Sequence, residues 1–299
     1  MVFLRKNKII FILVIAIISI GISETFLRYK GAIDFPIYQV ESNGHYSLVP
    51  NQQGSFLNKN SWFVNSDGFN NNREIDAKKP YVMLVGDSVV YGGNPVDYKD
   101  RIGYGLEKEL SKNVYVGALG GWSLYNEMQF IRKNINVARQ ADLLVIQYDN
   151  GDLSNLSKAS LNSVVHPTEK PKLATYYYLE KYIYPKLISK TNVSELPPIP
   201  EKVSSSGDWE KELLEISKNT NGKILFVLYP DKKALADKDI WEKQTYHIKG
   251  FIDNNRDKFD YIDIAKVPKW NSQLYRDGIH PSTDGNKVIA NVIASYVKQ

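Results

Sequence analysis

The chain has 299 residues and a formal net charge of +5, with 43% apolar and 24% charged residues. This length and composition fit one large α/β domain with additional segments and argue against a disordered chain. The basic residues are scattered apart from a small group at the N-terminus, so a nucleic-acid partner is not predicted. Cysteine is absent, which excludes disulfide bonds and thiolate metal sites.

Residues 1–30 predict a signal anchor. Arg5, Lys6 and Lys8 precede an uncharged, mostly aliphatic run from residue 9 to residue 23. A cleaved secretory signal peptide has a similar organisation, but no A-x-A cleavage pattern follows the run, so an uncleaved anchor is favoured. The basic residues predict a cytoplasmic N-terminus and a single pass through the cell membrane. The body of the protein is then expected on the periplasmic or extracellular face.

Residues 31–79 predict an irregular lead-in of turns and short strands, because Asn, Gly and Ser are frequent there. From residue 80 to residue 299, apolar runs alternate with amphipathic stretches. Strands are expected at 81–87, 113–119, 141–148, 223–230 and 259–265, and helices at 100–111, 123–140, 208–220, 239–255 and 282–298. Continuously apolar strands that alternate with helices predict a central parallel sheet covered on both faces.

An insertion at about 153–206 interrupts this alternation. It contains the aromatic stretch "ATYYYLEKYIYPKLI", which predicts helix, and then a Pro- and Ser-rich loop. An excursion of this length is typical of a lid or a binding element. Its tyrosines, at 176, 177, 178, 182 and 184, either stack on a sugar or acyl chain or pack the insertion onto the main domain.

Three predicted strands end in unusual residues: Gly86-Asp87-Ser88, the glycine-rich stretch 117–121, and the Asp/Asn stretch 148–152. The carboxyl ends of parallel strands line one crevice. Near the C-terminus, Asp277 and His280 stand three residues apart. A serine nucleophile needs a base, and the base needs an acceptor that orients it.

Ser88, His280 and Asp277 are therefore predicted to be nucleophile, base and orienting acid. The N–H groups of Ser88 and Gly120, with an amide side chain, are expected to form the oxyanion hole. Taken singly, Ser88 is also a fitting helix N-cap and Asp277 a fitting turn residue; their joint occurrence favours catalysis. No cofactor is expected, and the dispersed His45, His166 and His247 do not predict a metal site.

The Gly86-Asp87-Ser88 block and the Asp277-x-x-His280-Pro281 block, with the glycines around Gly120, resemble those of the SGNH/GDSL hydrolase superfamily. The resemblance implies a flavodoxin-like three-layer α/β/α sandwich with catalytic Ser88, Asp277 and His280. It also implies an oxyanion hole made by Ser88, Gly120 and Asn150.

One departure concerns the third block. The family commonly has Gly-Asn-Asp after the third strand, whereas this chain has Asn150-Gly151-Asp152. Aligned on the aspartate, Gly151 takes the asparagine position, and loss of one oxyanion donor costs roughly 10² to 10³ in rate. Weak activity, another stabilising group and a degenerate site all remain open.

The lead-in stretches "YSLVPNQQGSF" and "NSDGFNNNRE", and the pair Glu24 and Arg28, resemble membrane-anchored bacterial SGNH proteins associated with surface polysaccharides. The function expected from this resemblance is an extracytoplasmic serine esterase that removes O-acyl groups, O-acetyl above all, from a cell-surface glycan. Two alternatives are an O-acyltransferase with the same triad and a non-catalytic protein that binds glycan or assists assembly. The sequence leaves the acyl group and the glycan open.

Overall fold

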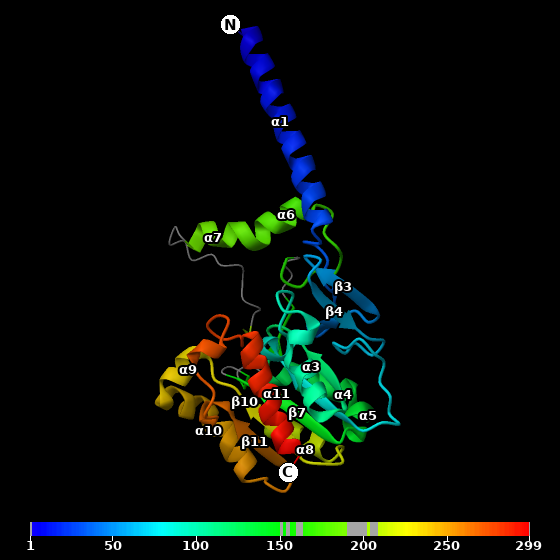
Figure 1. Ribbon diagram of the computed structural model, residues 1–299, viewed down its shortest axis with the longest axis vertical. Helices are drawn as coiled ribbons and strands as arrows, with labels where there is room; N and C mark the ends of the chain where they lie inside the picture. Colours follow the sequence, from blue (N-terminus) through cyan, green and yellow to red (C-terminus); the bar gives the residue numbers. More distant parts are fainter. Residues whose placement is uncertain are drawn as a thin grey trace.

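The structure is a computed structural model that describes residues 2–149, 152–153, 156–159, 164–189, 202–203 and 209–298 (Figure 1). Its centre is a five-stranded parallel sheet in the order β11-β10-β7-β5-β6. The strands are β5 (Tyr81–Gly86), β6 (Asn113–Ala118), β7 (Leu143–Tyr148), β10 (Ile224–Leu228) and β11 (Phe259–Asp263). Taken in chain order, they stand as 2-1-3-4-5, the flavodoxin-like arrangement.

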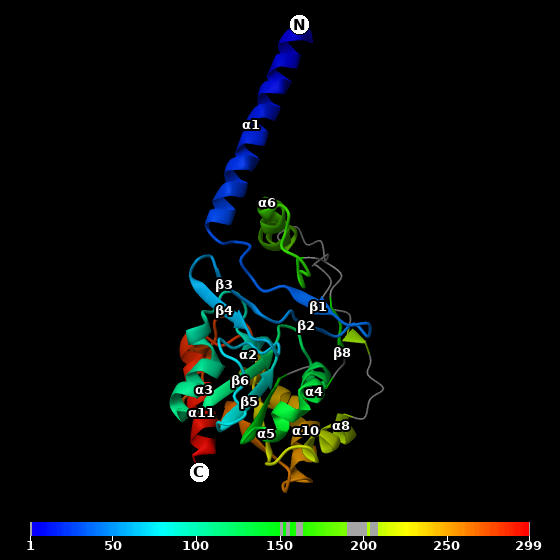
Figure 2. The same ribbon diagram turned by 90° about the vertical axis from the view of Figure 1, so that its right-hand side faces the viewer.

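Helices cover both faces of this sheet, which confirms the predicted three-layer fold (Figure 2). On one face, α3 (Ile102–Leu110) packs against α11 (Thr283–Val297). The other face carries α4 (Leu124–Lys133), α5 (Ile135–Gln140), α8 (Trp209–Ser217) and α10 (Lys238–Asp253). All six residues of β5 and all five of β10 are buried, as expected for strands between two helical layers.

The stretch 123–140, expected as one helix, forms two. Asn134 separates α4 from α5 with φ −109° and ψ 31°, and its side-chain amide donates to the carbonyl of Phe130 at 3.0 Å. A side chain that caps the last turn of the preceding helix offers the backbone an alternative to continuing it. Short helices that the periodicity did not predict are α2 (Ser88–Tyr91), α9 (Lys232–Ala236), η1 (Tyr98–Asp100), η3 (Ile264–Lys266) and η4 (Ser272–Leu274).

The lead-in forms two antiparallel pairs and then covers the edge of the sheet. The pairs are β1 (Tyr38–Val40) with β2 (Tyr46–Leu48), and β3 (Gln52–Phe56) with β4 (Asn60–Val64).

Two asparagines that follow β4 bind β6. Asn71 accepts the N–H of Val116 and donates to the carbonyl of Val114, both at 2.7 Å. The side chain of Asn70 accepts the N–H of Ala118 at 3.0 Å. These amides take the place of a further strand at an edge that would otherwise have open hydrogen-bonding groups.

The N-terminal helix α1 (Val2–Tyr29) projects away from the body (Figure 1). Its span Ile10–Tyr29 has a mean hydropathy of 2.5 and no buried residue, so its length and composition suit a membrane crossing.

The insertion contributes a helix that lies across the end of α1, composed of α6 (Ala174–Tyr178), the π-helical turn η2 (Leu179–Ile183) and α7 (Tyr184–Ser189). The π-helical turn ends two residues before Pro185, which lacks an N–H for the helical ladder. The insertion also holds a two-stranded pair, β8 (Leu156–Ser157) with β9 (Lys202–Val203).

The tyrosines of the insertion divide between two faces of this helix. Tyr177 is buried and stacks on Phe35 at 4.9 Å between ring centroids, and Tyr178 contacts Tyr182 at 5.0 Å. Tyr176 and Tyr184 are exposed. Packing therefore accounts for the first three of these residues, and not for the last two.

Candidate active site

Ser88 lies two residues after the end of β5, at the point where the strand order reverses between β5 and β7. Asp87 is the N-cap of α2, with its side chain accepting the N–H of Val89 at 2.7 Å, and Ser88 is the first helical residue. The alternative of Ser88 as the N-cap is therefore wrong. Gly86 permits the tight turn, because a Cβ there would lie 2.5 Å from Cγ2 of Val90.

Asp277 and His280 lie in a turn that precedes α11. The N–H of Arg276 donates to the carbonyl of His280 at 2.8 Å, which closes the turn. The N–H of Lys232 donates to the carbonyl of Gly278 at 2.9 Å, which holds the turn near the end of β10. The helix itself begins later, with Ser282 as its N-cap. Neither residue of the pair is therefore a helix residue.

The structure brings these three side chains into one hydrogen-bonded chain. Nε2 of His280 lies 3.0 Å from Oγ of Ser88, and Nδ1 of His280 lies 2.9 Å from Oδ2 of Asp277. Residues 192 positions apart in the sequence thus meet at the carboxyl end of the sheet. This edge faces the end of the molecule that carries α1, since α2 lies at the α1 side of β5 (Figure 2).

The Asp277 carboxylate is held in its charged form. Partial burial acts to raise its pKa, but the N–H groups of His280 and Ile279 and the His280 ring outweigh this and lower the pKa to about 2. The two N–H groups donate to Oδ1 at 2.8 and 3.0 Å. The side chains of Asp277 and His280 are 46% and 27% exposed, so the site opens to solvent. A charged carboxylate on Nδ1 favours the tautomer whose Nε2 can accept a proton from Ser88.

Gly120 lies beside Ser88 in the loop between β6 and α4. A Cβ at Gly120 would lie 3.9 Å from Cβ of Ser88, which puts the loop backbone next to the serine. The hydroxyl of Tyr46 donates to the carbonyl of Gly120 at 2.9 Å, and the indole of Trp122 donates to the carbonyl of Tyr46 at 3.1 Å. Asn150 and Gly151 lie outside the described residues. The sequence did not single out Tyr46, because no local pattern reports a contact between the lead-in and this loop.

A group of buried carboxyl side chains lies behind the serine turn: Asp87, Glu127 and Asp149. Burial, and then the nearby charges of Asp87 and Asp149, raise the pKa of Glu127 well above its ordinary value. Burial also raises the pKa of Asp87, against the opposing effect of the Val89 N–H. Within the described part of the chain, neither carboxyl oxygen of Glu127 has a hydrogen-bond partner. The signal for Glu127 in the sequence is its place on the apolar face of α4.

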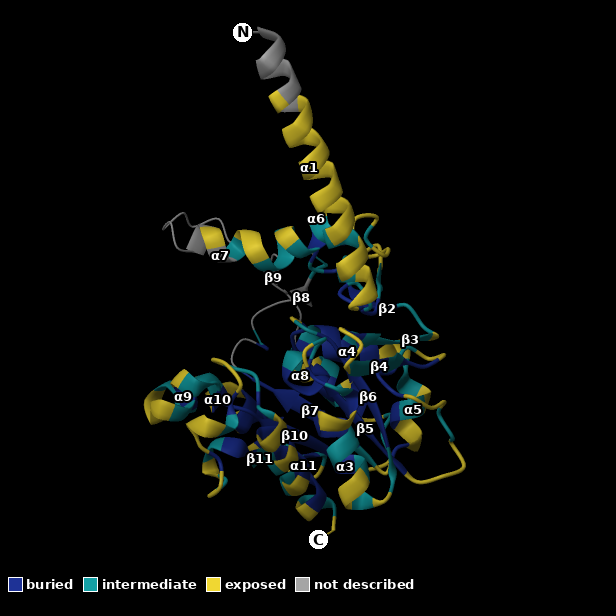
Figure 3. Cartoon of the chain, turned by 45° about the horizontal axis from the view of Figure 1, so that its top comes forward, coloured by how far each residue is buried: buried dark blue, intermediate teal, exposed yellow. Residues whose placement is uncertain are grey.

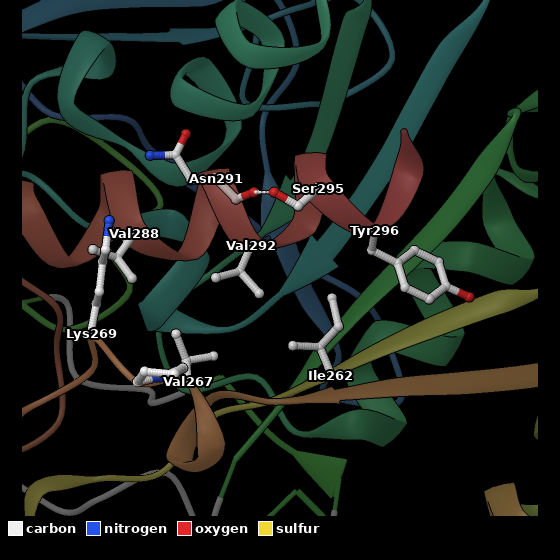
Figure 4. Close-up of a pocket in the computed structure, with 9 residues that line it drawn as sticks. Ile262, Val267, Lys269, Val288, Asn291, Val292, Ser295 and Tyr296 are labelled. Carbon is white, nitrogen blue, oxygen red and sulfur yellow. Dashed lines mark hydrogen bonds between the residues drawn. The ribbon is translucent and has the colours of Figure 1, made fainter. Parts of the chain in front are cut away.

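A groove of about 520 Å³ lies between α11 and the end of β11 (Figure 4). Its floor is apolar, formed by side chains such as Ile262, Val267 and Val292. The hydroxyl of Ser295 in this groove is used within the helix, where it donates to the carbonyl of Asn291. None of the lining residues belongs to the Ser88, His280 and Asp277 group, so the groove is separate from the candidate site.

The chain belongs to the GDSL-like Lipase/Acylhydrolase family, whose pattern it matches over residues 82–293. This confirms the resemblance inferred from the sequence. Members of this class are serine esterases or acyltransferases, and the chain is an enzyme of that class. No curated protein matches the chain.

Several solved structures resemble the chain at low sequence identity. A lipolytic protein of the G-D-S-L family from Veillonella parvula is 13% identical, with a TM-score of 0.42, 73% of this chain covered and 98% of the other. The C-terminal catalytic domain of peptidoglycan O-acetyltransferase A from Streptococcus pneumoniae is 13% identical, with a TM-score of 0.40, and coverage is 74% and 93%. A family two carbohydrate esterase from Clostridium thermocellum is 11% identical, with a TM-score of 0.43, and coverage is 73% and 63%.

Proposed function

We propose that the chain is a membrane-anchored, extracytoplasmic serine esterase that removes O-acyl groups, O-acetyl above all, from a cell-surface glycan. The observation that carries the proposal is the hydrogen-bonded chain from Ser88 through His280 to Asp277. A serine is a poor nucleophile until a neighbouring base takes its proton, and this arrangement supplies the base and its orienting group.

In the proposed reaction, Oγ of Ser88 attacks the acyl carbon while Nε2 of His280 takes the serine proton. The imidazolium formed in this step is stabilised by the Asp277 carboxylate, which keeps its charge because its pKa is about 2. His280 then gives the proton to the leaving alcohol, and an acyl group remains on Ser88. Attack by water, with His280 again as base, releases the acid and restores the serine.

The negative charge that develops on the acyl oxygen needs donors. The N–H groups of Ser88 and Gly120 are the proposed donors, with Asn150 as a third. The hydrogen bond from Tyr46 to the carbonyl of Gly120 supports this assignment, since it holds the loop in one position beside the serine.

The open position of the site supports a substrate carried on a large polymer. Asp277 and His280 are partly exposed, so an acyl group that projects from a glycan can approach Ser88 without entering a deep tunnel. The proposed location follows from α1, whose basic residues precede the apolar span and predict a cytoplasmic N-terminus. The body, with its site, then lies on the opposite side of the membrane, where surface glycans are found.

The same residues can transfer the acyl group to a sugar hydroxyl in place of water. The first half of the reaction is identical, and only the acceptor in the second half differs. Product analysis with an added glycan acceptor distinguishes the two outcomes, because a transferase forms a new acetylated sugar and a hydrolase releases free acetate.

The full-length protein in detergent, treated with a fluorophosphonate probe, tests the proposal. Wild type is expected to label, whereas Ser88→Ala and His280→Ala are not. Ser295→Ala is the matched control, since Ser295 is an exposed serine of α11 outside the site. Separate wild-type protein that has not been treated with the probe is given acetylated glycans, and release of acetate is measured. Labelling that persists in Ser88→Ala would overturn the assignment, as would a folded wild type that hydrolyses no ester.

A further inference from the structure

The helix formed by α6, η2 and α7 is apolar on the side that the body does not cover. The apolar side chains on this side, called the outer face below, recur at helical spacing and are between 37% and 63% exposed: Leu173, Tyr176, Leu179, Ile183, Tyr184 and Leu187. Exposed apolar residues of this number on one helix face are unusual for a protein surface in water.

The opposite side of the same helix is bound to the body. Tyr177 is buried on Phe35, and the ammonium of Lys181 lies 5.5 Å from the centre of the Phe35 ring. Figure 3 shows this helix, with exposed residues along it, at the end of the body from which α1 projects.

Polar contacts fix this helix to the end of α1. The carboxylate of Glu24 accepts the N–H groups of Ala174 and Thr175 at 3.0 and 2.9 Å, which caps the first turn of α6. Arg28 donates to Glu24 at 2.6 Å and to the carbonyl of Lys172 at 2.7 Å. The polar groups at this junction are thus paired with one another, as an apolar environment requires.

The position of this junction along α1 matches the position expected for the surface of the bilayer that α1 would cross. The uncharged residues 10–23 of the span Ile10–Tyr29 rise roughly 21 Å at about 1.5 Å per residue, so the residues that follow them, up to Tyr29, are needed to reach the roughly 30 Å of a hydrocarbon core. A short uncharged run draws its flanking residues toward the acyl chains. The residues that flank this run include the aromatic Phe26 and Tyr29, which suit the interface between lipid and water.

We propose that residues 173–187 form an interfacial helix that lies in the headgroup region of the membrane that α1 crosses, with the outer face toward the acyl chains. This inference rests on the anchoring stated in the proposed function. Continuity selects lipid as the occupant, because α6 packs against α1 and the apolar side chains of α1 are exposed as well. The exposed Arg28, Lys30 and Lys172 at the junction match the negative charge of anionic headgroups. The helix then fixes the tilt of the body, with the catalytic edge of the sheet turned toward the membrane.

The absence of cysteine allows a direct test with single spin labels. The full-length protein is reconstituted into vesicles of phosphatidylethanolamine and phosphatidylglycerol, with a nitroxide on Leu179→Cys or Leu187→Cys. Ile18→Cys in α1 serves as the lipid control and Tyr246→Cys, on the exposed side of α10, as the water control. Collision of each label with oxygen, which concentrates in lipid, is compared with collision with a water-soluble nickel chelate.

The expected result is that labels at 179 and 187 collide mainly with oxygen, as at 18, while the label at 246 collides mainly with nickel. Lipid contact at 18 with water contact at 179 and 187 would overturn the interfacial helix and leave the anchor intact. Water contact at 18 would overturn both. Labels at 179 and 187 shielded from both reagents would show that protein covers the outer face, which also overturns the proposal. Fluorophosphonate labelling of the same variants reports the proposed catalysis separately.

Discussion

The catalytic edge of the sheet and the end formed by α1 and the α6–α7 helix distribute their side chains in opposite ways. At the catalytic edge, the apolar residues of β5 are buried, and the polar residues Ser88, His280 and Asp277 face the opening. In the second region, the apolar residues of the outer face are exposed, and the carboxylate of Glu24 is bonded between two helices. The first region is arranged for water, and the second is stable only if another apolar phase covers it.

Asp277→Asn tests the catalytic edge with the largest expected effect. The amide cannot stabilise the imidazolium and favours the wrong ring tautomer, so kcat/KM for a soluble ester should fall by roughly 10⁴-fold. The measurement is steady-state hydrolysis of an acetyl ester by the full-length protein. Activity within tenfold of wild type would show that Asp277 has no such role.

The lowered pKa of Asp277 also predicts a pH dependence. A carboxyl group whose folded pKa is below its ordinary 3.8 stabilises the turn above that pH, and this contribution is lost as pH falls through about 2. Loss of activity on acidification that begins above about pH 4 therefore belongs to another group of the site. The pH–rate profile of the wild-type protein is the measurement, and activity that is lost only as pH falls through about 2 would assign the acid limb to Asp277 itself.

Tyr46→Phe tests whether the lead-in supports the oxyanion loop. Removal of the hydroxyl frees the carbonyl of Gly120, and a lost hydrogen bond of about 1 to 1.5 kcal/mol corresponds to roughly a tenfold fall in kcat. KM should change little, because the contact acts on the loop and not on the ground-state substrate. Tyr246→Phe, at an exposed tyrosine, is the control. Equal kinetics for both variants would remove Tyr46 from the site.

Glu127→Gln should change stability in a direction set by pH. Because the folded pKa of Glu127 lies above 4.5, the carboxyl group favours the folded state at low pH, and this preference is lost as pH rises through the raised pKa. Glutamine does not titrate, so the Tm of the variant should gain on that of wild type as pH rises above about 4.5, until the raised pKa has been passed. Thermal unfolding of both proteins across that pH range is the measurement, and parallel curves would contradict the prediction.

Glu24→Ala has the smallest expected effect on turnover and a clear effect on the other end of the molecule. A soluble ester should be hydrolysed within about twofold of the wild-type rate, since the hydrogen-bond partners of Glu24 are Arg28, Ala174 and Thr175, none of which belongs to the catalytic group. A spin label at residue 179 should move from lipid toward water, because the cap on α6 is lost. A large loss of turnover, with unchanged collision of the label at 179 with oxygen and nickel, would contradict the prediction. It would show that Glu24 acts on the catalytic edge and not on the position of the helix.

The sheet could be predicted from the sequence because its strands are continuous apolar runs. This pattern can be recognised without knowing which segments pack against each strand. Ser88, Asp277 and His280 could be named because their short blocks carry the chemistry. The remaining features depend on distant pairings. The Asn70 and Asn71 amides on β6, the Tyr46 hydroxyl on Gly120 and the Glu24 cap on α6 each join segments that share no local pattern.

The break at Asn134 shows the same limit on a smaller scale. Apolar periodicity runs through 123–140, but one side-chain hydrogen bond ends α4 before α5 begins. The turn before Ser88 differs in this respect, because the sequence itself indicates it. Gly86 is needed where a Cβ would clash, and Asp87 is a typical N-cap residue.

The asparagine cover of β6 decides where a truncated protein can begin. The family match starts at residue 82, yet the hydrogen bonds of Asn70 and Asn71 occupy backbone groups of β6 that a protein starting there would leave open. An open edge strand pairs readily with another chain, so such a fragment is expected to aggregate more readily than one that begins near residue 31 and keeps these two asparagines. The family match omits the lead-in. By covering the edge of β6, the lead-in thus opposes self-association of the protein.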